Sequence, residues 1–148
     1  MSHRTTLTEP LRGWRAWQVI DTRRGAALAS WWVSEVWPPG HPLEARCAVH
    51  GPRPSVHHVC GILAFSARDE ALACLERDDE TPLLFSRRPE LALGGHVSGW
   101  GRTVAHERGG RSQFAYPYDL HLIRGDSALA RAIASRYAVE TSPFPALP

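Results

Sequence analysis

The stretch from Cys47 to Gly61, CAVHGPRPSVHHVCG, constrains the fold most, because a metal ion bound there would hold the two ends of a loop together. It contains two of the three cysteines and three of the eight histidines in the chain. Thiolate and imidazole groups in two close pairs suit a tetrahedral zinc ion. The sequence therefore predicts a structural zinc site with the ligands Cys47, His50, His58 and Cys60. His57 is an alternative to His58, and two buried thiols beside solvated histidines are the alternative to a metal site.

The length and composition of the chain indicate one domain with a core of its own. Hydrophobic residues make up 43% of the 148 residues, as in a typical globular protein. We expect a flexible N-terminus over residues 1–13, a globular domain over 14–140 and a proline-rich tail over 141–148. The odd number of cysteines argues against a disulfide framework.

The same sequence indicates a cytoplasmic protein without a membrane partner. No apolar run approaches the roughly 18 residues that a membrane span needs. The N-terminal residues lack the apolar core of a signal peptide.

The pattern of apolar, glycine and proline residues predicts strands and two helices. The strands are expected in a hairpin over residues 14–33 and then over 60–65, 94–104, 112–118 and 120–123. The helices are expected over 67–77 and 128–138. Three prolines within residues 37–42 predict a loop. The expected fold class is therefore α+β: a bent, mostly antiparallel sheet, or a partly closed barrel, on which two helices pack.

Glycines distinguish the expected strand over 94–104, which contains four of them. Glycine inside a strand marks a bulge or a close approach of another backbone. A further pair, Gly109–Gly110, can adopt the positive φ of a tight turn. The sequence therefore predicts a hairpin over 94–123 that turns at Gly109–Gly110.

Aromatic and arginine side chains around this hairpin predict a ligand-binding surface. Trp100 offers a flat face on which a base can stack, and the neighbouring arginines offer phosphate contacts. The candidate ligand-binding residues are Trp100, Arg102, His106, Arg108, Arg111 and Tyr116. A solvated hairpin tip is the plainer interpretation of such a charge run. All 17 basic residues are arginines, which the coding bias of a high-GC genome would also produce.

Several short motifs resemble those of a group of small, uncharacterised bacterial proteins, mostly from high-GC genomes. The motifs are Trp37-Pro-Pro-Gly40, Cys60-Gly-Ile-Leu-Ala64, Gly99-Trp-Gly-Arg102, His106-Glu-Arg108 and Ala115-Tyr-Pro117, together with Cys47. The group looks as if it has Cys-x-Cys-Gly where this chain has His58-Val-Cys60-Gly61, which changes the type of one candidate ligand. The resemblance implies one compact domain and assigns no catalytic residue.

These observations favour a non-catalytic binding module for nucleic acid or a modified base, with zinc as a structural cofactor. The net charge of +2 permits nucleic-acid binding without requiring it. One alternative is an interaction adaptor that contacts a protein partner through an exposed Trp31 or Trp32. Another is a small hydrolase or transferase using His106 as a general acid or base. No nucleophile stands at a recognisable spacing from His106, so no catalytic set is predicted.

Overall fold

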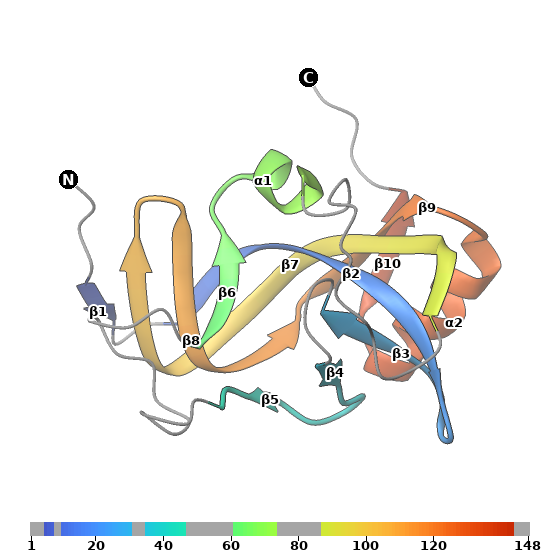
Figure 1. Cartoon of the computed structure of the whole chain (residues 1–148), viewed down its shortest axis with the longest axis horizontal. Helices are drawn as coiled ribbons and strands as arrows, with labels where there is room; N and C mark the ends of the chain where they lie inside the picture. Colours follow the sequence, from blue (N-terminus) through green and yellow to red (C-terminus); the bar gives the residue numbers. More distant parts are fainter. Residues whose placement is uncertain (1–4, 8–9, 31–34, 47–60, 74–86, 144–148) are drawn as a thin grey trace.

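The computed structural model describes residues 5–7, 10–30, 35–46, 61–73 and 87–143 of the chain. Within them the fold is α+β, as predicted: a mostly antiparallel sheet with two helices (Figure 1). The strands are β1 (Thr5–Leu7), β2 (Leu11–Thr22), β3 (Gly25–Ser30), β4 (Val36–Trp37), β5 (Leu43–Glu44), β6 (Ile62–Phe65), β7 (Arg87–His106), β8 (Gly109–Pro117), β9 (Asp119–Arg124) and β10 (Glu140–Pro143). The helices are α1 (Arg68–Ala73) and α2 (Ser127–Tyr137).

The long strand β7 organises the sheet, since it pairs with β1, β2, β8 and β9 (Figure 1). The main strand order is β10-β9-β7-β8-β6-β2-β3-β4, and among the strands in the described residues only the pairing of β10 with β9 is parallel. Because β2 pairs with both β6 and β7, hydrogen bonds close a ring through β2, β7, β8 and β6. Small residues permit this tight ring: a Cβ at Gly13 would lie 2.8 Å from Ala64 Cβ.

The core lies on the face of the sheet that α2 covers. Trp17 of β2, Leu28 of β3 and Leu93 of β7 are completely buried there. Trp37 packs edge-on against Trp17, with ring centroids 5.5 Å apart and an interplanar angle of 86°. These two tryptophans therefore contribute to stability as core residues.

Helix α2 begins and ends with capping interactions. The Asp126 side chain accepts hydrogen bonds from the backbone N–H groups of Ala128 and Leu129, and the helix ends at Ala138 in the left-handed conformation, with φ 55°. The helix packs against β3, β9 and β10. Its last residue, Tyr137, donates a hydrogen bond to the Trp37 carbonyl and accepts one from Leu28 N–H at 2.7 Å. This buried hydroxyl joins the helix to the sheet.

The hairpin of β7 and β8 forms as predicted, but the predicted turn position is wrong. His106 pairs with Gly109, so the turn residues are Glu107 and Arg108. Gly109 follows the turn with a φ of 142°, as in hairpins that place a positive-φ residue after the turn itself. A Cβ at Gly109 would lie 1.9 Å from the Ala64 carbonyl oxygen, so the glycine is required for strand packing as well.

No helix in the described parts of the chain is long and apolar enough to cross a membrane.

Candidate metal centre

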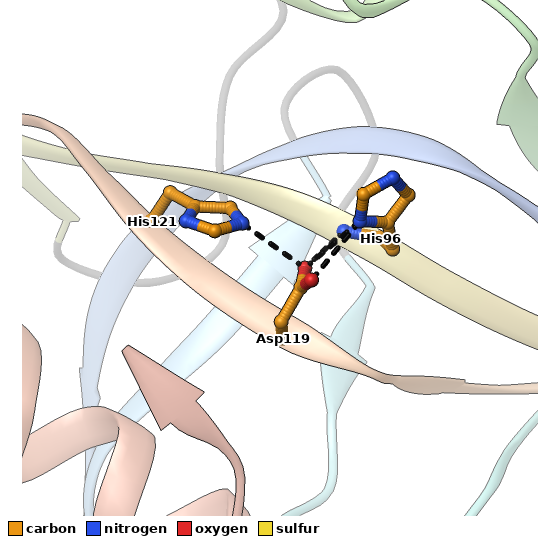
Figure 2. Close-up of side chains that lie close together, drawn as sticks. All are labelled: His96, Asp119 and His121. Carbon is orange, nitrogen blue, oxygen red and sulfur yellow. Dashed lines mark hydrogen bonds and ion pairs between the residues drawn. The ribbon is translucent and has the colours of Figure 1, made fainter. Parts of the chain in front are cut away.

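Three polar side chains from neighbouring strands meet on one face of the sheet (Figure 2): His96, Asp119 and His121. A β-bulge brings them together. Pro117 pairs with Val97, and His121 pairs with Gly94. From one pair to the next, the chain advances four residues from β8 into β9 but only three along β7, so the β8–β9 side contains one extra residue. The extra residue lies where β8 passes into β9, and such bulges commonly redirect side chains at functional sites.

The bulge places Asp119 directly against Gly95 of β7. A Cβ at position 95 would lie 2.2 Å from the Asp119 carbonyl oxygen and 2.9 Å from its Oδ1, so only glycine permits this approach. The backbone N–H of His96 then donates to Asp119 Oδ1 at 2.6 Å, in place of a strand carbonyl. Tyr118 N–H donates to the His96 carbonyl at 2.8 Å. These backbone contacts therefore hold the Asp119 carboxylate in position independently of the two imidazole rings.

The carboxylate of Asp119 lies between the two imidazole rings (Figure 2). His96 Nδ1 is 3.0 Å from Oδ2 and 3.3 Å from Oδ1. His121 Nε2 is 3.4 Å from Oδ1. Since His121 is two residues after Asp119 on the same strand, its ring lies on the same face.

Trp14 of β2 forms one wall of the site. Its ring centroid is 3.8 Å from that of His96 and 6.4 Å from that of His121, with tilted planes in both cases. The side chains of the group remain partly open to solvent, with exposed fractions of 28% for His96, 21% for Asp119 and 14% for His121. An ion from solution therefore has access to a group that is already positioned.

The environment keeps Asp119 ionised. Burial alone would raise the pKa of its carboxyl group. Hydrogen bonds from the His96 backbone and ring, together with the charges of His96 and His121, outweigh burial and lower this pKa below its ordinary value. The carboxylate is therefore available as an anionic ligand across the neutral pH range.

The spacing of the group suits a metal ion. Two ligand atoms bound at about 2.1 Å to one ion, at angles between octahedral and tetrahedral, are separated by roughly 3.0 to 3.4 Å. With Asp119 Oδ1 as the shared ligand atom, the separations to His96 Nδ1 and His121 Nε2 are 3.3 Å and 3.4 Å, within this range. All the ligand atoms lie within 4.8 Å of one another.

The residues predicted from sequence as a zinc site lie outside the described residues: Cys47, His50, His57, His58 and Cys60. The same holds for Trp31 and Trp32, the candidate contacts of a protein partner. The zinc site and the protein-partner contact therefore both stay predictions. The group that can hold a metal in the described part of the chain consists of other residues.

The predicted ligand-binding residues of the hairpin lie in different environments. Arg102 is exposed, and so is Arg108, whose Nε is 3.4 Å from Glu70 Oε1. Arg111 is buried, with 3% of its surface exposed. Trp100 is half-buried and stacks on Phe114 at 6.1 Å between centroids.

Tyr116 and His106 are the remaining residues of the predicted ligand-binding surface. Tyr116 is half-buried, and its hydroxyl accepts from Gly40 N–H at 2.8 Å and donates to the Tyr137 carbonyl at 2.9 Å. His106 is the last residue of β7. Nucleic-acid binding by this hairpin stays a prediction.

Sequence reasoning missed the His96–Asp119–His121 group. One signal was visible: Asp119 and His121 are two residues apart, a spacing that puts both on one face of a strand. The expected strand, however, began only at Leu120, whereas β9 begins at Asp119. Their partner His96 is 23 residues away from Asp119, and only strand pairing brings the two together. No protein-family model, curated protein or solved structure matches the chain.

Proposed function

We propose that the protein binds a divalent transition-metal ion through His96 Nδ1, Asp119 and His121 Nε2, and that it presents this ion to a ligand. The observation that supports the proposal is the spacing of the three groups, with His96 Nδ1 and His121 Nε2 at 3.3 Å and 3.4 Å from one oxygen of an ionised carboxylate. Zinc is the ion with which to test it first, because two imidazoles and a carboxylate are a ligand set that zinc accepts.

Three protein ligands leave at least one coordination position open. Structural zinc sites are normally closed by four protein ligands, whereas three protein ligands with an open position are typical of sites that bind water or substrate. Two histidines and a carboxylate also form the ligand set of non-haem iron(II) sites. The group therefore fits a metal that acts as a Lewis acid toward a bound ligand better than it fits a purely structural metal.

A hydrogen-bonded group without metal is the competing interpretation. In that state protons lie between the carboxylate and the two rings, and the group serves only to join β9 to β7. Metal binding requires the ligating nitrogens to be free of protons, so the ion would replace these protons. The two interpretations differ in whether the group has affinity for metal.

Titration of the metal-free protein with Zn²⁺, followed by calorimetry, tests the proposal. We expect one ion to bind, and the substitutions His121→Ala and Asp119→Asn to weaken this binding roughly tenfold or more. His41→Ala is the matched control, because His41 is an exposed histidine of the loop between β4 and β5. Equal Zn²⁺ affinity in the wild type, His121→Ala and Asp119→Asn would contradict the proposal.

Titration with Co²⁺ separates this site from the thiol site predicted from sequence. Thiolate ligands give Co²⁺ intense near-ultraviolet charge-transfer bands, and nitrogen and oxygen ligands do not. We expect visible Co²⁺ bands that disappear in His121→Ala. Thiolate bands that persist in His121→Ala would report Cys47 and Cys60 instead.

A further inference from the structure

Arg12 of β2 is an exposed cation next to the candidate metal centre. Its guanidinium carbon lies 3.8 Å from the ring centroid of Tyr118, which immediately precedes Asp119. Tyr118 itself is 52% exposed, so this stacked pair is at the surface. Among the residues that the structure describes, no carboxylate forms an ion pair with Arg12.

The sheet register places Arg12 on the same face as the metal centre. Trp14 pairs with His96 and packs against its ring, and Arg12 is two residues before Trp14 on the same strand. Residues two apart on a strand share a face. Arg12 pairs with Ser98, two residues after His96 on β7. In the sheet, Arg12 and Ser98 therefore form the neighbouring same-face pair to Trp14 and His96, and the guanidinium lies over Tyr118, the residue before Asp119.

The stacking on Tyr118 leaves the edge of the guanidinium available. A guanidinium that lies flat on an aromatic ring still presents its N–H groups at its periphery, where a carboxylate or phosphate can accept two hydrogen bonds. The ring also restricts the motion of the long arginine side chain. Arg12 is thus suited to hold an oxyanion beside the metal.

We infer that the site takes a small oxyanion ligand, a carboxylate or a phosphate, which binds the metal and the Arg12 guanidinium together. The inference rests on the proposed metal centre. A divalent ion together with Asp119 and Arg12 carries a net charge of about +2, which favours an anion in the open coordination position. Arg12 contributes the second contact and so determines which anions bind.

Titration of the Co²⁺-loaded protein with inorganic phosphate and, separately, with benzoate tests the inference. We expect one of them to change the visible Co²⁺ spectrum with saturation, because an oxygen of the anion enters the coordination sphere. Arg12→Ala should weaken this anion binding roughly tenfold or more without changing the affinity for Co²⁺. Arg12→Lys, which keeps the charge but not the planar fork, should give an intermediate affinity.

Arg23→Ala is the control, since Arg23 is an exposed arginine in the turn between β2 and β3. No spectral change with either anion, or equal anion affinity in the wild type and Arg12→Ala, would overturn the inference while leaving the metal centre intact. Failure of the wild type to bind Co²⁺ would overturn both. Thermal melting of each variant checks that a lost response does not reflect unfolding.

Discussion

Gly95 shows how one residue without a side chain can determine the position of a functional group. Its missing Cβ leaves room for the Asp119 carbonyl oxygen, which would lie 2.2 Å from that atom. The carboxylate of Asp119 then reaches His96 N–H at 2.6 Å. A general expectation for glycines inside a strand, that another backbone comes close, is fulfilled at this position.

We predict that Gly95→Ala lowers both stability and metal affinity. The new methyl group must displace β9, which should cost about 1–3 kcal/mol of unfolding free energy. It should also move Asp119 away from His96 and weaken Zn²⁺ binding. Urea unfolding and Zn²⁺ titration measure the two effects.

Gly99→Ala is the matched control for this substitution. Gly99 lies on the same strand, and a Cβ there would lie 2.4 Å from Ser112 Oγ, in the β7–β8 pairing. Gly99→Ala should lower stability but retain Zn²⁺ affinity. Unchanged Zn²⁺ affinity in Gly95→Ala would show that the position of Asp119 does not depend on Gly95.

The sequence indicates which residues are chemically able to form a site, but not which of them meet. The spacing of Asp119 and His121 is that of two residues on one face of a strand, although the expected strand began one residue later, at Leu120. His96 joins them only because a bulge shifts the register between β7 and the strands opposite it. A register shift of one residue moves side chains to the opposite face of the sheet relative to their partners. No local pattern in this sequence indicates that such a shift occurs here.

At the scale of elements, helix α2 depends on a buried hydroxyl as well as on apolar packing. Tyr137 is 1% exposed, and its hydroxyl contacts two backbone groups, the N–H of Leu28 and the carbonyl of Trp37. Burial raises the pKa of Tyr137 to about 12, although the hydrogen bond from Leu28 opposes the shift. The neutral hydroxyl is therefore the form that stabilises the docked helix.

We predict that Tyr137→Phe destabilises the protein by about 1–3 kcal/mol, because it removes the partner of two buried backbone groups. The pKa of Tyr137 is raised on folding, so its contribution is fully present below the unfolded-state pKa of about 10. It is lost as the pH rises toward the folded-state value of about 12. The difference in stability between the wild type and Tyr137→Phe should therefore shrink above pH 10.

Urea unfolding from pH 8 upward measures this difference. Tyr118→Phe is the control, because Tyr118 is 52% exposed. A stability difference between the wild type and Tyr137→Phe that stays constant as the pH rises past 10 would contradict the prediction.

Elements were easier to predict from this sequence than their exact connections. Helix α2 follows from the apolar spacing of Leu129, Ile133 and Tyr137, and the β2–β3 hairpin from its turn composition. The turn of the β7–β8 hairpin was misplaced because Gly109–Gly110 was attributed to turn geometry. Both glycines also avoid packing clashes, with Ala64 and with Leu11. Such tertiary requirements are invisible in a local pattern.

At the scale of the whole molecule, charge limits what the β7–β8 hairpin can contribute to nucleic-acid binding. The net charge of the chain is +2. Arg111 is buried, which leaves Arg102 and Arg108 as the exposed arginines of the predicted surface. Two phosphate contacts correspond to a slope of log affinity against log salt no steeper than about −2.

We predict that any binding of single-stranded DNA or RNA through this hairpin has this shallow slope, and that Arg102→Ala reduces the slope by about one unit. Fluorescence titrations at low and physiological salt measure it, with Arg23→Ala as the control. A slope that is unchanged in Arg102→Ala, or no binding at low salt, would end the nucleic-acid hypothesis for this hairpin.

The most direct measurement is a crystal structure of the Zn²⁺-loaded protein with anomalous diffraction recorded at the zinc absorption edge. We predict an anomalous peak at about 2.0–2.2 Å from His96 Nδ1, an Asp119 carboxylate oxygen and His121 Nε2. A fully loaded crystal with a zinc peak only beside Cys47 and Cys60, or with no peak beside Asp119, would contradict it.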